Sequence, residues 1–318
     1  MLFREDASFY AQGIKDGRFT AIERVSQALE NVEKHNDRLN AVIHVQAEEA
    51  LERAALFDEK LDRLTNQERQ QVSDFFGVPI LLKDAGHDQA GKPATSGSKL
   101  LKDRKAQETS HFVQDILDAG FIVVGRTNVS EFALKGISDS LFYGSVNLPQ
   151  DLTRNAGGSS GGAAAAVKAG LVPIATASDG GGSIRIPASF TGLIGLKVTN
   201  GRTAHGPGTY RSWQGAAVDF AITRSVRDTW LLLQNLQRVE YRAPFTLPKI
   251  QEDVLTPRDR PLKIAYLENW SLSDEPNPDG AAMMEKSKAL LEKLGHSLMP
   301  AYPDFDAERV SSTYFTVY

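Results

Sequence analysis

The sequence predicts an α/β fold with a mixed, largely parallel central sheet covered by helices. Up to about Lys60, apolar residues recur at helical spacing. From Gly77 onward, short apolar runs alternate with helical segments and glycine-rich turns. Gly120 and Gly170 each stand between a helical pattern and an apolar run, where a helix commonly ends in a left-handed residue. This alternation favours helices packed on a sheet with parallel strands.

The N-terminal part, residues 1–60, is expected to be a helical arm that packs on the surface and contains one short strand at 41–45. Its apolar stripe consists of Ile22, Val25, Ala28, Leu29 and Val32. A core at 77–230 follows. Buried strands are predicted there at 77–82, 121–124, 171–177 and 192–198, and helices at 111–119 and 163–169.

The C-terminal part begins after a proline-rich stretch. Residues 241–261 hold four of the fourteen prolines and are predicted to be a loop excursion. A strand at 262–267 and a helix at 281–294 are expected in the remaining region, 262–318. We expect residues 1–318 to form a single domain.

Composition excludes several classes of protein. The hydrophobic fraction is 41%, the charged fraction is 24% and the formal net charge is −4, so we expect no nucleic-acid partner. No apolar run is long enough for a membrane span, and Arg4, Glu5 and Asp6 occupy the start where a secretory signal needs apolar residues. We therefore predict a cytoplasmic protein. The absence of cysteine excludes disulfides, thiolate metal sites and cysteine nucleophiles.

Two Gly/Ser clusters within residues 155–189 are the candidate chemical core. Glycines at this density indicate tight turns or close backbone approach, and the Ala-rich helical segment after the first cluster, 157–162, disfavours a flexible linker. The second cluster, 179–183, lacks the residues of a phosphate-binding loop. Its backbone N–H groups suit an oxyanion, and Ser183 at its end is the natural nucleophile.

A serine nucleophile needs a base. All six histidines lie outside the two clusters, but a histidine base stays open because such groups assemble in space. Lys83 is the other candidate, since it ends the apolar run 77–82 and would project from a buried strand. To act near neutral pH its pKa must fall by roughly three units, which burial can supply. An ordinary lysine at a strand end is the alternative.

Three segments together resemble the amidase-signature enzymes: 77–84, the 157–162 cluster, and the run SDGGGSIRIPASFTGLIGLKVTNGR at 178–202. The resemblance implies that Lys83 is the base, that Ser159, preceded by a cis peptide, is the intermediate serine, and that Ser183 is the nucleophile of an amidohydrolase. It also implies an oxyanion hole made by Gly180, Gly181, Gly182 and Ser183, supported by Asp179, Arg185 and Ser160. No cofactor or metal is implied, and a small amide is the expected substrate.

The sequence departs from the family pattern at Ser178, Gly180 and Val198, none of which removes a catalytic group. The SDGGGS form favours the branch of 6-aminohexanoate cyclic-dimer hydrolases. Family members usually exceed 400 residues, so the resemblance implies that the family's C-terminal portion is missing here.

Other interpretations stay open. An amidotransferase A-type subunit would pass ammonia to a partner, and an inactive paralogue would act as a binding or assembly module. A homodimer is a further option for assembly. The string Ser96-Gly97-Ser98-Lys99 fits an SxxK hydrolase, but the companion motifs of that class are absent. Phe142, Tyr210 and Trp213 are candidates for an apolar pocket wall, with ordinary packing as the alternative.

Overall fold

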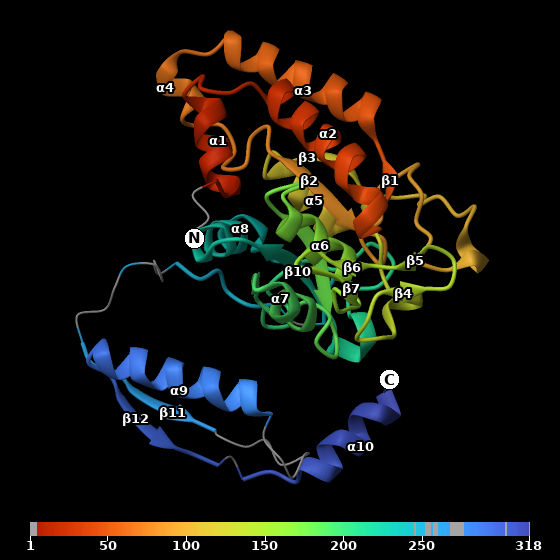
Figure 1. Cartoon of the computed structure of the whole chain (residues 1–318). Helices are drawn as coiled ribbons and strands as arrows, with labels where there is room; N and C mark the ends of the chain where they lie inside the picture. Colours follow the sequence, from red (N-terminus) through yellow and green to blue (C-terminus); the bar gives the residue numbers. More distant parts are fainter. Residues whose placement is uncertain are drawn as a thin grey trace. The chain divides into compact units, whose positions relative to one another are not determined.

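A six-stranded mixed sheet lies at the centre of the larger of two compact units, residues 1–252 (Figure 1). The computed structural model describes residues 5–244, 246–251, 256, 260–267, 277–302 and 304–317. The strand order is β1-β3-β2-β8-β10-β9, with bounds Val42–Val45, Ile122–Thr127, Pro79–Lys83, Ala175–Asp179, Val218–Thr223 and Ile194–Gly195. Strands β3, β2 and β8 are parallel, and β9 shares their direction because it is antiparallel to β10, which is antiparallel to β8. The predicted mixed, largely parallel sheet is confirmed.

Helices surround this sheet, as expected from the alternation in the sequence. Those of the larger unit are α1 Ala7–Lys15, α2 Ala21–Leu39, α3 Ala47–Asp62, α4 Asn66–Arg69, α5 His111–Asp118, α6 Gly161–Ala169, α7 Arg185–Thr191 and α8 Val226–Leu236. Helices α2 and α6 pack against each other and against strands β2 and β3. None of the described helices is both long and apolar enough to cross a membrane.

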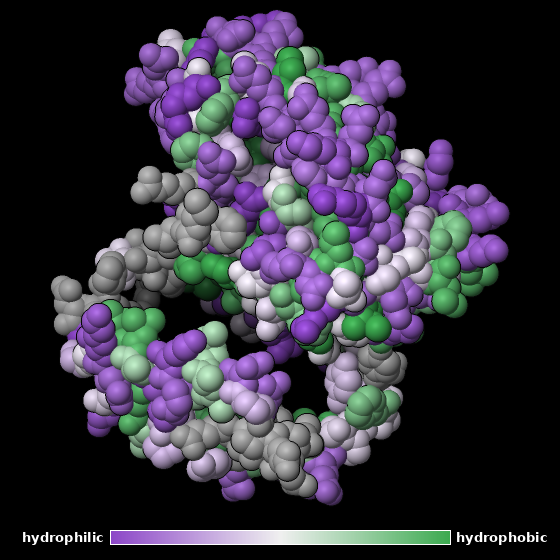
Figure 2. Space-filling model, in the orientation of Figure 1, coloured by the Kyte–Doolittle hydropathy of each residue, from purple (hydrophilic) through white to green (hydrophobic). Residues whose placement is uncertain are grey.

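The N-terminal arm shows why its sequence forms helices. A capping box of Thr20 and Glu23 starts α2, and Asn40 ends it in the left-handed conformation. Val25 and Val32 of the predicted stripe are buried against the core, whereas Ile22 remains 40% exposed. Figure 2 shows mainly hydrophilic residues over the outer side of α2 and α3, which agrees with this amphipathic pattern.

The carboxyl ends of two adjacent parallel strands lie at one edge of the sheet. Strand β2 is buried throughout and ends at Lys83, while its neighbour β8 ends at Asp179. Open sheets of this class bind ligands beyond the carboxyl ends of their strands. The fold therefore brings Lys83, which follows the apolar run 77–82, next to the second Gly/Ser cluster, 179–183.

Strand β10 lies inside the sheet between β8 and β9, although no strand is predicted there from the sequence. Its apolar residues are interrupted by Asp219, whose carboxylate is held by two histidines distant in sequence. The predicted strand 171–177 shares only its last three residues with β8. The buried segment before Ala175 does not pair with a neighbouring strand. Four two- to five-residue strands are also absent from the prediction: β4 Asp139–Ser140, β5 Gly144–Ser145, β6 Asn147–Leu148 and β7 Asp151–Asn155.

Residues 253–318 form a second compact unit, whereas the sequence predicts a single domain over residues 1–318. It contains the parallel strands β11 Lys263–Tyr266 and β12 Ser297–Pro300, with helix α9 Pro278–Lys293 against β12 and helix α10 Ala307–Val317. The strand and helix expected at 262–267 and 281–294 are thus present. Of the expected loop 241–261, Phe245, 252–255 and 257–259 lie outside the described residues, and the described part contains no helix or strand.

Gly162, at the start of α6, allows this helix to approach the backbone of the sheet. A Cβ atom at Gly162 would lie 2.4 Å from the Asn128 carbonyl oxygen and 2.5 Å from that of Ala41. We expect Gly162→Ala to lower the free energy of unfolding by about 2 kcal/mol or more, because the clash is with backbone. Urea unfolding measures this. Gly136→Ala is the matched control, since its nearest neighbour would be a flexible Ile186 side chain at 3.5 Å. Equal stability of the two variants would contradict the prediction.

Candidate active site

Lys83 is fully buried at the end of β2 and points at two serine hydroxyls. Its Nζ lies 2.8 Å from Ser159 Oγ and 2.8 Å from Ser178 Oγ. Its backbone N–H donates to Thr176 Oγ1 at 2.9 Å, which fixes the strand end against β8. The structure thus brings Lys83 and Ser159, 76 positions apart in the sequence, into direct contact.

Burial changes the proton affinity of this lysine. Loss of water around the ammonium lowers the pKa of Lys83 to about 7, although the negative charges of Asp219 and Asp179 oppose the shift. A substantial neutral fraction is therefore present near pH 7. A lysine base needs a pKa near neutral, and Lys83 meets this requirement.

Ser159 and Ser160 follow strand β7 at the start of α6. The peptide bond between Gly158 and Ser159 is cis, as the resemblance implies. Both serine side chains are buried. The N–H of Ser160 donates to the carbonyl oxygen of Ser183 at 3.3 Å, so Ser160 joins the first Gly/Ser cluster to the second.

Asp179 organises the loop that carries Ser183. Its carboxylate accepts hydrogen bonds from the backbone N–H groups of Gly182, Ile184 and Arg185, and from the Arg185 guanidinium through Nε and Nη2, both at 2.9 Å. Burial alone raises the pKa of Asp179, but the Arg185 hydrogen bonds and charge outweigh it and hold the pKa below its usual value. Asp179 and Arg185 thus form a bidentate ion pair.

One predicted oxyanion donor is already engaged. The N–H of Gly182 donates to Asp179 Oδ1 at 2.9 Å, so it is not free to bind an oxyanion. Among the described residues, the N–H groups of Gly180, Gly181 and Ser183 have no hydrogen-bond acceptor. These three remain as the candidate donors.

A cavity of about 900 Å³ opens over these groups, lined by Ser159, Ser178, Gly180 and Ser183 among others. Of the three aromatic candidates for its wall, Tyr210 and Trp213 line it, whereas Phe142 does not. Ser96 of the SxxK string also lines the cavity, but Lys99 is exposed and outside the lining. The arrangement therefore pairs the buried lysine with Ser159 rather than with Ser96.

A buried cluster next to Lys83 is not predicted from the sequence. Asp219 of β10 accepts from His87 Nε2 at 3.1 Å and contacts His205 Nδ1 at 3.1 Å. His87 is buried, which lowers its pKa, and its Nδ1 contacts Thr176 Oγ1 at 2.7 Å. The two histidines lower the pKa of Asp219 far below its usual range against the opposing effect of burial. No local motif signals this cluster, because its members come from three separate segments.

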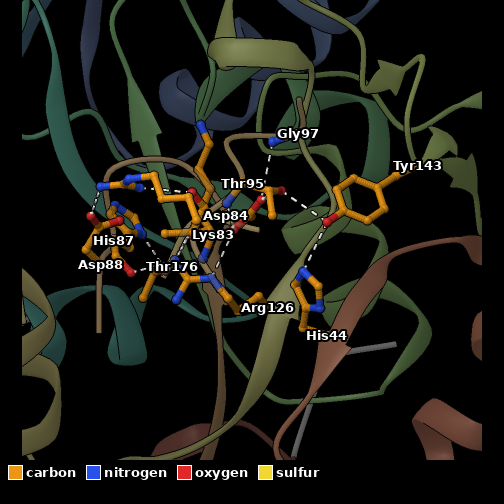
Figure 3. A network of polar contacts seen from close by, with 12 residues as sticks. His44, Lys83, Asp84, His87, Asp88, Thr95, Gly97, Arg126, Tyr143 and Thr176 are labelled. Carbon is orange, nitrogen blue, oxygen red and sulfur yellow. Dashed lines mark hydrogen bonds and ion pairs between the residues drawn. The ribbon is translucent and has the colours of Figure 1, made fainter. Parts of the chain in front are cut away.

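Asp84 anchors the loop after Lys83 through a network shown in Figure 3. Its carboxylate accepts from Arg126 Nε at 3.1 Å, from the N–H groups of Thr95 and Gly97 at 3.2 Å each, and from the Thr95 hydroxyl. Arg126 also donates to the carbonyl oxygen of His87 at 2.8 Å. The network holds both ends of the segment that follows β2.

No group of three or more histidine, aspartate or glutamate side chains is placed to hold a metal ion in the part of the chain that the structure describes.

Comparisons with known proteins agree with the fold and the motifs. The Amidase family model matches residues 23–318. A lipoamidase from Enterococcus faecalis is 36% identical over 96% of this chain and 38% of its own length, and the A subunit of a glutamyl-tRNA(Gln) amidotransferase from Chromohalobacter salexigens is 33% identical over 92% and 61%. A solved structure of 6-aminohexanoate cyclic dimer hydrolase complexed with substrate matches with a TM-score of 0.88 at 31% identity, over 98% of this chain and 64% of that one. The chain thus spans less than two thirds of these relatives, and it belongs to the Amidase family.

Proposed function

We propose that this chain hydrolyses a carboxamide C–N bond through an acyl-enzyme on Ser183. The observation that carries the proposal is the contact of the buried Lys83 Nζ with Ser159 Oγ at 2.8 Å beside a cavity lined by both Ser159 and Ser183. A lysine with a pKa of about 7 supplies a base, and the cavity supplies room for an amide. Family membership supports the same chemistry.

In the proposed reaction, neutral Lys83 accepts the Ser159 proton while Ser159 accepts the Ser183 proton. The Ser183 oxygen then bonds to the amide carbonyl carbon, and the resulting oxyanion accepts from the N–H groups of Gly180, Gly181 and Ser183. Ser159 returns a proton to the amine nitrogen as the C–N bond breaks, with Lys83 restoring the Ser159 proton. Water repeats the sequence on the ester, releasing the acid and regenerating Ser183.

Ser178 gives the lysine a second contact. Its Oγ lies 2.8 Å from Lys83 Nζ and fixes the amine between two hydroxyls. The Asp179 carboxylate, paired with Arg185, in turn fixes the backbone on both sides of Ser183 by accepting from the N–H groups of Gly182, Ile184 and Arg185. In this proposal both act by positioning groups that react.

The test is covalent labelling of the purified chain with a fluorophosphonate probe, with the site located by mass spectrometry. We expect the label on Ser183, its loss in Ser183→Ala, and its retention in Ser189→Ala, a control on the exposed face of α7. Absence of label from a folded chain would overturn the proposal and favour a binding or assembly module.

A second candidate function is the release of ammonia for a partner, favoured by the 33% identity to an amidotransferase A subunit. Both functions predict labelling of Ser183. Ammonia release from glutamine, stimulated by a co-purifying partner and tRNA, would support the second one. Hydrolysis of simple amides by the isolated chain would support the first.

A further inference from the structure

Trp213 lies against the loop that carries Ser183. A Cβ atom added at Gly180 would lie 2.8 Å from Cε3 and 2.9 Å from Cζ3 of the Trp213 indole, so the ring packs directly on the Gly180 backbone. Trp213, Gly180 and Ser183 all line the cavity, and none of the three is fully buried. The indole is therefore part of the cavity wall, next to an N–H group that belongs to the proposed oxyanion hole.

The glycine at position 180 is required by this contact. Gly182 in the same loop has a φ of 125°, which L side chains rarely adopt, but the φ of Gly180 lies outside this region. The backbone conformation at Gly180 is therefore open to residues with a side chain. The space is not, because a Cβ atom essentially never comes within 3.0 Å of another heavy atom. Any side chain at position 180 would displace the indole.

A strained turn holds Trp213 in this place. Trp213 and Gln214 have φ values of 48° and 53°, in the left-handed region, and the Asn200 side chain donates to the carbonyl oxygen of Gly215 in the same turn. Non-glycine residues in this conformation are costly and gather at functional sites. Within the part of the chain that the structure describes, six non-glycine residues have a positive φ, and four of them line the cavity: Ser96, Phe132, Ala133 and Trp213.

The proposed reaction assigns the sides of a bound amide. The amine nitrogen faces Ser159, which returns a proton to it, and the carbonyl oxygen faces the N–H groups of the 180–183 loop. The acyl group takes the remaining direction from the carbonyl carbon. Because Gly180 has no side chain, the Trp213 indole is the side chain that stands over this part of the loop.

We propose that Trp213 is a specificity-determining residue whose indole contacts the acyl group of the substrate at the carbon next to the scissile carbonyl. The inference rests on the proposed amide hydrolysis and narrows it to amides in which this carbon is unbranched or planar. A flat apolar ring accommodates such a group along its surface, whereas a branch at this carbon needs the space that the indole fills.

The test uses four isomeric amides, so that all ligands carry the same atoms. Hexanamide and 2-ethylbutanamide differ only in branching next to the carbonyl, and N-butylacetamide and N-(butan-2-yl)acetamide differ only in branching on the amine side. Equilibrium binding is measured in the Ser183→Ala chain by ligand titration followed by nuclear magnetic resonance. We expect hexanamide to bind about 10-fold more tightly than 2-ethylbutanamide, and Trp213→Ala in this background to reduce the preference to less than about threefold.

The amine-side pair is the matched ligand control. Its binding ratio should change less than about twofold on Trp213→Ala. Tyr210→Ala is the matched control variant, because Tyr210 is a second aromatic lining residue near Trp213 in the sequence, and the preference for hexanamide should persist in it. An unchanged preference in Trp213→Ala, or a change confined to the amine-side pair, would overturn the inference.

Two further variants separate recognition from structural support. Trp213→Phe keeps a flat ring and should retain part of the preference for hexanamide. Gly180→Ala keeps the backbone N–H and the indole but moves the ring, so it should also reduce the preference. The same preference in Gly180→Ala as in the parent would contradict the contact on which the inference depends.

Failure of the proposed function has a different signature. If Ser183 is not labelled but the preference for hexanamide still depends on Trp213, the indole selects the ligand in a cavity that binds without hydrolysis. If Ser183 is labelled and Trp213→Ala leaves the preference unchanged, the hydrolase proposal stands and the role of Trp213 is withdrawn.

Discussion

Replacing Lys83 with methionine is expected to reduce amide turnover and fluorophosphonate labelling by about 10³-fold or more, because the change removes the base that activates Ser159. Methionine has a similar length and is apolar, so it fills the buried space. Labelling rates in the parent and the variant measure the effect. Retention of most of the rate would mean that the base lies elsewhere, with the His87–Asp219–His205 cluster as the next candidate.

Lys83 also sets the pH dependence of labelling. Since burial lowers the pKa of Lys83 to about 7, labelling of the parent should rise as pH increases through about 7 and level off above it. The neutral amine is the reactive form, so the labelling rate falls on the acid side of this pKa. A pH profile of the labelling rate tests this, and a rate that is independent of pH between 6 and 8 would contradict the assignment of the base.

The Lys83→Met substitution should not lower stability at acidic pH, although it removes activity. The lysine pKa falls from 10.5 to about 7 on folding, so the folded ammonium carries a penalty of about 5 kcal/mol below pH 7. Two lost hydrogen bonds of about 1 kcal/mol each do not offset this. At pH 6 we expect Lys83→Met to unfold at no lower urea concentration than the parent. The parent gains stability as pH rises from 7 to 10.5, so the difference should shrink across that window.

Local sequence patterns are sufficient to predict much of the sheet, whereas the Lys83 contact follows only from the family resemblance. The apolar run before Lys83 is a buried strand, and Gly120 and Gly170 have φ values of 96° and 82°, as the helix-end pattern predicts. The contact of Lys83 with Ser159 agrees with what the family resemblance implies. The roles of Lys83, Ser159 and Ser183 stay predictions until they are measured.

Other parts of the site depend on contacts that no local pattern encodes. The carboxylate of Asp219 becomes informative only when folding places it between His87 and His205, which are separated by more than a hundred positions. Strand β10 escapes prediction for a local reason, because the acidic Asp219 interrupts its short apolar run. The engagement of Gly182 by Asp179 likewise depends on the conformation of one turn, and a run of glycines does not specify which N–H groups remain free.

The second large effect is expected at the buried ion pair of Asp84 and Arg126. Both side chains are fully shielded from solvent, and Asp84 also accepts from Thr95 and Gly97. Asp84→Ala leaves the Arg126 guanidinium buried without its counter-charge, so we expect the free energy of unfolding to fall by about 3 to 5 kcal/mol. Urea unfolding followed by circular dichroism measures the loss.

A double-mutant cycle separates the ion pair from the loss of the individual side chains. Arg126→Met alone leaves the carboxylate buried, whereas Asp84→Ala together with Arg126→Met removes both charges and should cost at least about 2 kcal/mol less than the sum of the single changes. Glu59→Ala is the control, since the ion pair of Glu59 with Arg63, just after the end of α3, is solvent-exposed and should contribute too little to measure. Additive losses in the cycle would show that Asp84 acts through its hydrogen bonds to the 95–97 loop, and that Arg126 is held independently by the His87 carbonyl.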